Sequence, residues 1–558
     1  MTVEKQTTAH GDVLIIGAGP VGMTLALDLA RRGIDVIIVE KQRADAAPRT
    51  RCNHISARSL EYYRSLGIAT EIRNAGLPRS HPHDVAYVTS LTGHELTRIR
   101  IPASENTYGS VGYADSGWPT PEPPHRCNQL YWEPILREHL RTTPNIRTFY
   151  GTEITDIEQD LAQVTARGVN GAGESVQFNA TYLVGCDGGT SRVRKSIGAE
   201  FEGTEVISGT RGVYVRSRDL AVKRRVDPAW MTWFLNEYSY GCVVALDGTE
   251  LWSIQFFLPA GRTDFDSIDP HEGIKAAVGA EIDYEIISVD DWYGRRLVAD
   301  RFRDRRVFIC GDAGHLWIPM AGYGMNAGIA SAMTLSWQLA GVLSGWAEPG
   351  LLDAYEAERK PVTDQVSEHA MALGLANLDT DLVRNVPPML LAEGSEADAF
   401  RAEVGRELYD VNLGQFACAG LNFGSYYDAS PVISYDTESA PAYDLATYTP
   451  STVPGCRTPH IWLNDGRSLY DAMETGFTLL RMDPALDVSD LCLAAGKHNV
   501  PLQVIDLSVA EAGDIYQHKL VLSRPDQHVA WRGNTLPEDA SALIDLIRGA
   551  GNLSAERQ

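Results

Sequence analysis

The chain has 558 residues, enough for more than one hydrophobic core at about 100–200 residues per domain. Hydrophobic residues make up 44% and charged residues 22%, the balance of an ordinary globular protein. Acidic residues outnumber basic ones by 73 to 49, giving a formal net charge of −24. That charge repels nucleic acid and anionic membranes, so we expect neither as a partner.

The N-terminal stretch MTVEKQTTAHGD is polar and has no apolar signal core. The eight cysteines lie far apart, and no two form a CxxC pair. Reduced cysteines in a cytoplasmic protein fit this spacing, whereas a disulfide scaffold or a zinc ribbon does not. His81 and His83 have no further ligands close in sequence, so we expect no bound metal.

The first predicted element is a strand over residues 12–16, followed by the turn Gly17-Ala-Gly19-Pro20-Val-Gly22, a helix over 23–32 and a strand over 35–39. Glu40 ends this strand–turn–helix–strand unit. Glycines permit the tight turn and the close approach of a phosphate, and the helix N-terminus favours a pyrophosphate. An acid at the end of the second strand suits a ribose hydroxyl. The unit predicts an adenine dinucleotide site but does not choose between NAD and FAD.

The region from about 200 to 300 predicts an antiparallel sheet, because short apolar runs alternate with Gly, Asn and Asp turns. It is rich in aromatic residues, most of which we expect in the core. Such a sheet beside a nucleotide domain also suits the wall of an apolar ligand pocket.

A long helical stretch follows residue 328, and the Tyr-, Ser- and Pro-rich segment 420–455 is interpreted as a linker on the surface. The last hundred residues predict a thioredoxin-like βαββα unit without a CxxC, which favours a packing or oligomerisation role. Thr535 and Glu538 predict a capping box for its final helix.

Two further strands end in acid–glycine pairs, Asp187-Gly188 in VGCDGG and Gly311-Asp312 in FICGDAG. Carboxyl ends of strands are where open α/β sheets bind ligands, so these loops and the first glycine turn are expected to meet.

GAGPVG, CDGGTSRVR and FICGDAGH, in this order, resemble the dinucleotide, DG and GD motifs of the FAD-dependent aromatic hydroxylases. These are single-component flavoprotein monooxygenases with the para-hydroxybenzoate hydroxylase fold. With its thioredoxin-like tail, the chain resembles the phenol 2-monooxygenase and 2,4-dichlorophenol 6-monooxygenase branch. The resemblance implies an α/β fold with a Rossmann-like FAD-binding domain, an antiparallel-sheet substrate domain and a C-terminal thioredoxin-like domain. The expected boundaries are 1–80, 110–195 and 300–365 for FAD binding, 81–109 and 196–299 for substrate binding, 366–440 for a helical segment and linker, and 441–558 for the tail.

By this resemblance Asp312 accepts a hydrogen bond from a ribityl hydroxyl, Pro319 lies beside the isoalloxazine, and the backbone of 322–326 approaches its edge. Positive charge at the N-terminus of the following helix faces the flavin N1–C2=O locus. The full set of implied cofactor-binding residues is Gly17, Gly19, Pro20, Gly22, Glu40, Lys41, Arg49, Arg51, Arg126, Gln129, Asp187, Gly188, Asp312, Pro319, Gly322, Gly324, Met325 and Asn326.

The implied reaction uses FAD, NAD(P)H and O2 to hydroxylate a small phenolic substrate, ortho to its hydroxyl, through a flavin C4a-hydroperoxide. It needs a base for the phenol. Asn53 stands where phenol hydroxylase has an aspartate, so His54 beside it is our candidate base and both are candidate catalytic residues. The family's Asp and Asn after the glycine loop are replaced by Ser331 and Thr334.

One alternative within the fold is an FAD oxygenase of the rebeccamycin-pathway type that oxidises a large polycyclic natural product. The other is a flavin-binding protein without turnover, against which the intact Asp187 and Asp312 argue. The additional C-terminal domain favours a homo-oligomer.

Overall fold

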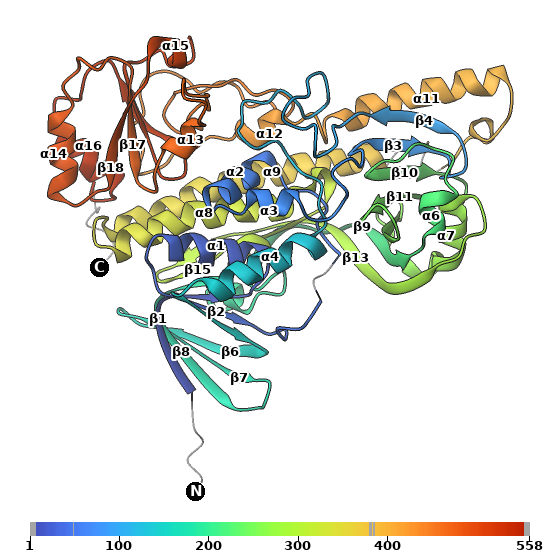
Figure 1. Cartoon of the computed structure of the whole chain (residues 1–558). Helices are drawn as coiled ribbons and strands as arrows, with labels where there is room; N and C mark the ends of the chain where they lie inside the picture. The colour runs from blue at the N-terminus through green and yellow to red at the C-terminus, as the bar shows by residue number, and fades with distance from the viewer. Residues whose placement is uncertain (1–6, 48–49, 379–381, 383–384, 552–558) are drawn as a thin grey trace, which may run out of the picture.

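The computed structural model describes residues 7–47, 50–378, 382 and 385–551, and its strands form three sheets. We call them the parallel sheet, the wide sheet and the small sheet. In Figure 1 the parallel sheet lies at the lower left, the wide sheet at the right and the small sheet at the upper left. Long helices run between the last two and join them.

The parallel sheet has the strand order β14-β15-β8-β1-β2-β5, and β7 and β6 extend it from β8. The pairs β5–β2, β2–β1, β1–β8 and β8–β15 are all parallel. Its central strands are continuous apolar runs because both faces of a parallel sheet are covered. The strands are β1 (Thr7–Ile16), β2 (Val36–Glu40), β5 (Ile146–Tyr150), β6 (Thr152–Gln159), β7 (Val164–Asn170), β8 (Ser175–Gly185), β14 (Arg303–Asp304) and β15 (Val307–Ile309).

Helices α1 (Pro20–Arg31), α4 (Gln129–Thr142) and α8 (Gly324–Leu343) pack together around this sheet. Helix α8 is buried along most of its length and carries no charged residue, as expected of a helix covered on several sides. The neighbouring helices are α2 (Ala57–Ser65), α3 (Ala69–Arg73), α5 (Arg192–Ser196) and α9 (Ala354–Leu378).

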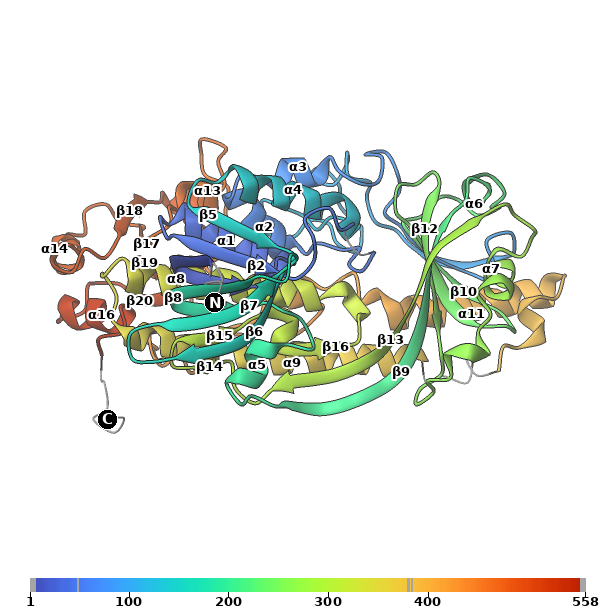
Figure 2. The ribbon, with the colours of Figure 1, turned by 90° about the horizontal axis from the view of Figure 1, so that it is seen from below.

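The wide sheet has the order β16-β13-β9-β12-β11-β10-β3-β4. It is antiparallel except for the pair β10–β3, which is parallel. Strands β9 and β13 are long enough to run from beneath the parallel sheet into the wide sheet, as Figure 2 shows. The strands are β3 (Val85–Val88), β4 (Glu95–Ile99), β9 (Phe201–Arg216), β10 (Met231–Leu235), β11 (Tyr240–Ala245), β12 (Leu251–Phe257), β13 (Glu285–Ala299) and β16 (His315–Trp317).

The two faces of the wide sheet differ. Phe256 faces α7 (Pro270–Val278), where a Cβ on Gly273 would lie 2.7 Å from its ring. The opposite face carries most of the aromatic rings, and α11 (Ser395–Leu413) packs against β4 at the sheet's edge. The remaining short helices of these two domains are α6 (Asp219–Val222), α12 (Ala419–Phe423), η1 (Phe265–Ser267), η2 (Gly311–Ala313), η3 (Met320–Gly322), η4 (Pro349–Asp353) and η5 (Pro388–Leu390).

The small sheet has the order β18-β17-β19-β20, with β17 and β18 parallel and the other pairs antiparallel. Its elements are α13 (Leu469–Ala472), β17 (Phe477–Arg481), α14 (Ser489–Lys497), β18 (Leu502–Asp506), α15 (Val509–Ala512), β19 (Leu520–Ser523), β20 (Val529–Gly533) and α16 (Ala540–Ile547).

Two sequence expectations in this region are wrong. The last helix is capped by Asp539, whose side chain accepts from Ala542 N at 2.9 Å, so Thr535 and Glu538 lie before the cap. The segment 420–455 is also more than a surface linker, because Tyr427, Val432 and Ile433 are buried. It contributes side chains to the junction between the small-sheet domain and the helices of the parallel sheet.

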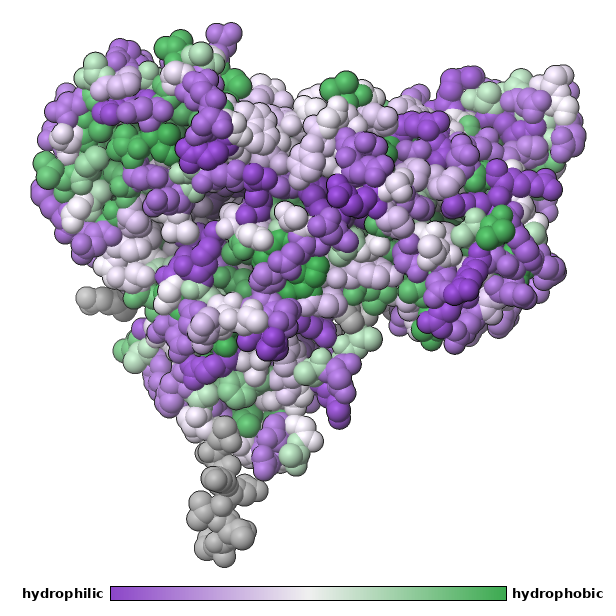
Figure 3. Space-filling view, in the orientation of Figure 1, coloured by the Kyte–Doolittle hydropathy of each residue, from purple (hydrophilic) through white to green (hydrophobic). Residues whose placement is uncertain are grey.

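Polar side chains cover most of the face seen in Figure 3, and apolar ones gather mainly over the small-sheet domain. Among the residues that the structure describes, no helix combines the length and the apolar character needed to cross a bilayer.

Candidate active site

Three strands of the parallel sheet end side by side. Ile16 of β1 pairs with Gly185 of β8, and Gly185 pairs with Ile309 of β15. The strands are parallel, so the glycine turn, the Asp187 loop and the Asp312 loop leave the sheet at one edge. The sequence-predicted meeting of these loops is therefore present in the structure.

The glycine turn leaves no room for side chains at two of its three glycines. Gly17 has φ +107°, and a Cβ there would lie 2.3 Å from the carbonyl oxygen of Cys186. A Cβ on Gly22 would lie 2.1 Å from the oxygen of Gly17. Gly19 is different, since a Cβ there would meet nothing within 4 Å. This open space lies at the N-terminus of α1, whose N-cap has no side-chain hydrogen bond, and it fits a pyrophosphate.

Glu40 lies beside the same turn. Its carboxylate accepts from the backbone N–H groups of Ala18 and Gln42, both at 2.8 Å. These bonds orient the carboxylate at the end of β2 and leave it lone pairs for a ribose hydroxyl. Lys41 next to it is exposed, and Arg49 lies outside the described residues.

Asp312 reaches the protein surface, and its side chain has no hydrogen-bond partner among the residues that the structure describes. Protein surrounding the carboxyl raises its pKa, and the nearby guanidinium of Arg51 lowers it in part. A free acceptor at this edge of the sheet fits a hydroxyl donor such as that of a ribityl chain.

The carboxylate of Asp187, in contrast, is hydrogen-bonded to residues of its own loop. Its carboxylate accepts from Ser191 Oγ at 2.5 Å and from the N–H groups of Arg192 at 2.7 Å and Val193 at 3.2 Å. Gly188 follows with φ +81°, a conformation that favours glycine. The structure thus gives Asp187 a part in shaping the loop, and its contact with FAD or nicotinamide stays a prediction.

The glycine-rich loop from Pro319 to Asn326 is held by the side chain of Asn326. Asn326 Oδ1 accepts from Ser56 N at 2.9 Å and Ser59 Oγ at 2.8 Å, and Nδ2 donates to Gly322 O at 2.7 Å and His54 O at 3.2 Å. The sequence predicted only backbone contacts here and missed this clamp. Of the other predicted members, Pro319 is exposed and Gly324 and Met325 are partly buried at the start of α8.

His54 packs against this loop, because a Cβ on Gly322 would lie 3.2 Å from His54 Cβ. Its Nδ1 is buried without a partner. Burial lowers the pKa of His54 well below its usual range, and Arg126 and His125 lower it further. The imidazole is therefore neutral and able to take part in a hydrogen bond, whereas its protonated, charged form is unfavourable.

The other sequence-predicted residues support the segment that carries His54. Asn53 Oδ1 accepts from Asn128 Nδ2 at 2.5 Å. Gln129 donates from its backbone N–H to Cys52 O at 2.8 Å. Arg126 is fully buried, forms an ion pair with Asp115, and lies 5.4 Å from the ring centre of Trp230. Direct contacts of Arg126 and Gln129 with FAD stay predictions.

One face of the wide sheet carries an aromatic cluster: Tyr87, Trp233, Tyr240 and Phe257. Trp233 stacks on Phe257 with centroids 5.3 Å apart, and on Tyr240 and Tyr87 at 5.2 and 6.2 Å. The cluster belongs to the same core as Ile318 and Met320, which flank Pro319. The apolar wall expected from the sequence and the residues that flank Pro319 therefore belong to one continuous core.

Comparison with known proteins identifies the family. Residues 10–370 match the FAD binding domain family, and residues 451–549 match the aromatic-ring hydroxylase C-terminal family. This chain belongs to the FAD-dependent monooxygenases. The open cradle at Gly19 and the unpaired Asp312 fit the cofactor, for which NAD(P)H is the usual reductant in this family.

Curated relatives extend over nearly the full chain. The FAD-dependent monooxygenase opdD of Penicillium oxalicum is 30% identical, over 89% of this chain and 99% of its own. Phenol 2-monooxygenase of a Pseudomonas species is 28% identical, over 98% and 94%. A solved structure of the rebeccamycin biosynthetic enzyme RebC with reduced flavin has a TM-score of 0.87 and 33% identity, and covers 98% of this chain and 100% of that one. The fold class and the hydroxylase family expected from the sequence are thus confirmed.

Proposed function

We propose that this monooxygenase uses NAD(P)H and O2 to hydroxylate a phenolic ring ortho to its hydroxyl group, the substrate being a phenol, a chlorophenol or a phenol-like natural-product intermediate. The observation that carries the proposal is the position of the 319–326 loop. It lies against His54 on one side and shares a core with the aromatic cluster on another. The named activity of the Pseudomonas relative supports the same reaction class.

Different residues of the chain bind different parts of FAD. The space at Gly19 and the N-terminus of α1 accept the pyrophosphate, Glu40 accepts from a ribose, and Asp312 accepts from the ribityl chain. Bound FAD supplies the activation of O2 for oxygen transfer to the ring. The buried aromatic cluster keeps water from the reacting region.

His54 is the proposed partner of the substrate hydroxyl. A neutral imidazole accepts a hydrogen bond from a phenol and draws its proton toward itself, which increases the electron density of the ring. Because burial lowers the pKa of His54, the imidazole stays neutral and acts as a hydrogen-bond acceptor for the substrate hydroxyl. Asn53, fixed by Asn128, holds the neighbouring backbone in place.

A second candidate is oxidation of a large polycyclic compound, as in the rebeccamycin pathway. The likeness to RebC over the whole chain supports it, and so does Ser331 in place of the family's aspartate after the glycine loop. Ser331 Oγ accepts from Arg359 Nε at 3.1 Å, so this part of α8 is tied to α9.

Anaerobic reduction of the bound flavin by NADPH and by NADH tests the proposal. It is measured alone and with a panel of phenols that includes 2,4-dichlorophenol and phenolic polycycles. We expect one substrate class to accelerate reduction, and with O2 to yield a product that carries one atom of ¹⁸O from ¹⁸O2. Acceleration by polycycles alone favours the second candidate, and reduction without any product from the panel contradicts the first. Cytoplasmic location and a homo-oligomeric state remain predictions.

A further inference from the structure

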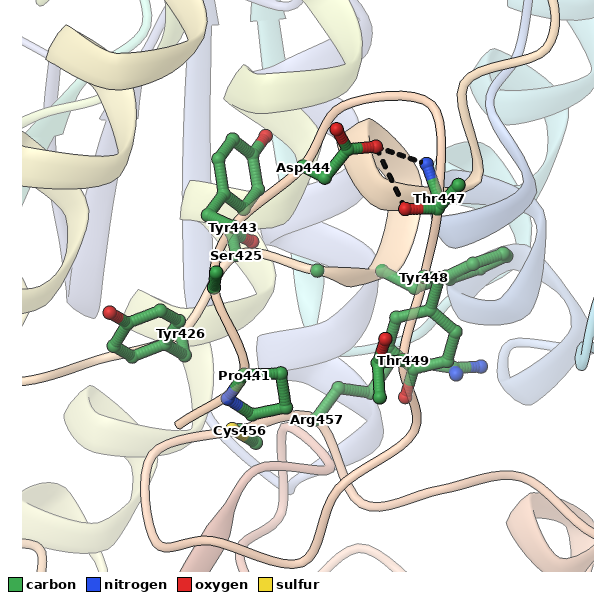
Figure 4. Close-up of a pocket in the computed structure, with 13 residues that line it drawn as sticks. Ser425, Tyr426, Pro441, Tyr443, Asp444, Thr447, Tyr448, Thr449, Cys456 and Arg457 are labelled. Carbon is green, nitrogen blue, oxygen red and sulfur yellow. Dashed lines mark hydrogen bonds between the residues drawn. The ribbon is translucent and has the colours of Figure 1, made fainter. Parts of the chain in front are cut away.

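A hollow lies where α2, α8, α9 and α12 meet the small-sheet domain. Its polar lining includes Arg58, Asn326, Arg359, Arg457 and His528. A second, outer hollow shares Phe423, Ser425 and Arg457 with it and is drawn in Figure 4. Four residues that line the outer hollow are exposed: Ala442, Asp444, Thr447 and Thr449. None of the proposed cofactor or substrate steps uses the inner hollow.

The junction around the inner hollow is densely charged. Arg524 is fully buried and pairs with Glu358 at 2.5 Å and with Asp526 at 2.6 Å. Glu358 also accepts from Ser430 Oγ at 2.5 Å. His528 stacks on the ring of Tyr427 in the same region. It adds no charge near neutral pH, because burial lowers its pKa to about 4. This part of the junction holds one cation against two anions.

The other part holds two cations against one anion. Arg58 Nη1 donates to Glu61 at 2.8 Å, and Arg457 pairs with the other oxygen of the same carboxylate. All three side chains are at most 9% exposed. The pairs described so far therefore balance at three arginines and three carboxylates.

Arg359 is one arginine more. It is 4% exposed, its Nε donates to Ser331 Oγ at 3.1 Å, and its Nη1 donates to Tyr427 OH at 3.2 Å. Both partners are neutral hydroxyls. Among the described residues no carboxylate forms an ion pair with Arg359, and two of its five N–H groups are used by the bonds just given. A buried cation without a counter-charge is costly, and proteins normally pair it.

We propose that the inner hollow binds one small monovalent anion, a halide or a small carboxylate, against the free N–H groups of Arg359. The anion neutralises the single excess positive charge of the junction. Asn326 lines the same hollow and clamps Gly322 and His54, so the occupied site stabilises the cofactor loop from behind. This site is separate from the proposed substrate site and does not depend on the identity of the substrate.

The test compares the thermal unfolding of the FAD-loaded enzyme in sodium chloride, bromide, acetate and gluconate at equal ionic strength. Gluconate, the largest of these anions, serves as the reference. We expect a saturable rise in Tm with the binding anion, which is lost in Arg359→Gln. In gluconate the variant should be at least as stable as the wild type, because it removes an unpaired charge. The exposed Arg262→Gln is the matched control and should keep the rise.

Crystals of the wild-type enzyme soaked in bromide supply a measurement that needs no variant. An anomalous peak at hydrogen-bond distance from the Arg359 guanidinium supports a halide site. A Tm rise with acetate but not with chloride, together with a carboxylate in the corresponding density, assigns the site to small carboxylates. Absence of an anion at Arg359 in both soaks, with equal salt responses in wild type and Arg359→Gln, would overturn the proposal.

Discussion

Asn326 Nδ2 donates a hydrogen bond to the backbone oxygen of His54 at 3.2 Å, which joins the loop predicted to hold the flavin to the candidate catalytic residue. The two residues lie 272 positions apart in the chain. The same amide group also donates to Gly322 O, so one side chain holds both the 319–326 loop and the segment that carries His54. The position of the His54 backbone beside this loop therefore depends on Asn326.

Asn326→Asp tests this clamp. The substitution keeps the acceptor oxygen for Ser56 and Ser59 but removes the donors to Gly322 and His54. This leaves Gly322 O without the side-chain donor and His54 O with only the weaker donor Cys52 Sγ. We expect destabilisation by about 1–3 kcal/mol and faster release of FAD. Thermal unfolding and the fluorescence of released FAD measure the two effects. Asn377→Asp, which removes one similar bond on α9, is the control. FAD release equal in the two variants would contradict the clamp.

Gly19 and Gly22 should respond differently to alanine. A Cβ at Gly19 meets no protein atom, so Gly19→Ala should leave the stability of the FAD-free protein within about 0.5 kcal/mol of wild type. It should weaken FAD binding by about tenfold or more, because the methyl group enters the phosphate space. Gly22→Ala should instead cost about 1–3 kcal/mol of stability, since its Cβ would lie 2.1 Å from Gly17 O. Titration of FAD and thermal unfolding separate the two. Unchanged FAD affinity in Gly19→Ala would place the pyrophosphate elsewhere.

Asp312→Asn should stabilise the FAD-free protein at neutral pH. Folding raises the pKa of the Asp312 carboxyl, so the protonated group favours the folded state. Its contribution to the free energy of unfolding is complete at pH values below the pKa of the unfolded chain. That contribution is lost as the pH rises through the pKa of the folded protein. The variant has no carboxyl to ionise, so it should be more stable than the wild type at neutral pH and equally stable toward pH 4. Urea unfolding at several pH values measures this difference. FAD affinity should change in the opposite sense and fall most in Asp312→Ala, which has no acceptor. A variant whose advantage does not vary with pH would exclude this assignment.

His54→Gln should reduce the rate of substrate hydroxylation by about 10²-fold while NAD(P)H still reduces the flavin. Because folding lowers the pKa of His54, the unfolded chain binds more protons, and stability is lost as pH falls below the ordinary value near 6.5. The wild type should therefore lose stability relative to His54→Gln between about pH 7.5 and pH 5. His271→Gln, at the exposed start of α7, is the control. Hydroxylation at the wild-type rate in His54→Gln would remove His54 from the mechanism.

Part of this site could be predicted from the sequence because its geometry is local. Gly17, Asp187 and Asp312 each follow an apolar strand directly, and parallel strands bring their ends to one edge. The clamp of Asn326 could not be predicted in this way, since its partners belong to α2 and the segment before it. Nor could the pairing of Arg126 with Asp115, because the chain between them has no regular pattern. The only sequence signal for the charged junction was Ser331, a departure from the family's aspartate that the structure connects to Arg359.

Strands β9 and β13 pair along almost their whole length and cross from one domain into the other. A hinge motion between the domains would have to bend both strands together, because hydrogen bonds join them along their length. The pairing of the two strands is irregular at two places, between Ile286 and Ser288 and between Gly294 and Arg296. Because the two strands resist a hinge between the sheets, we expect any movement that admits a ligand to occur in the loops.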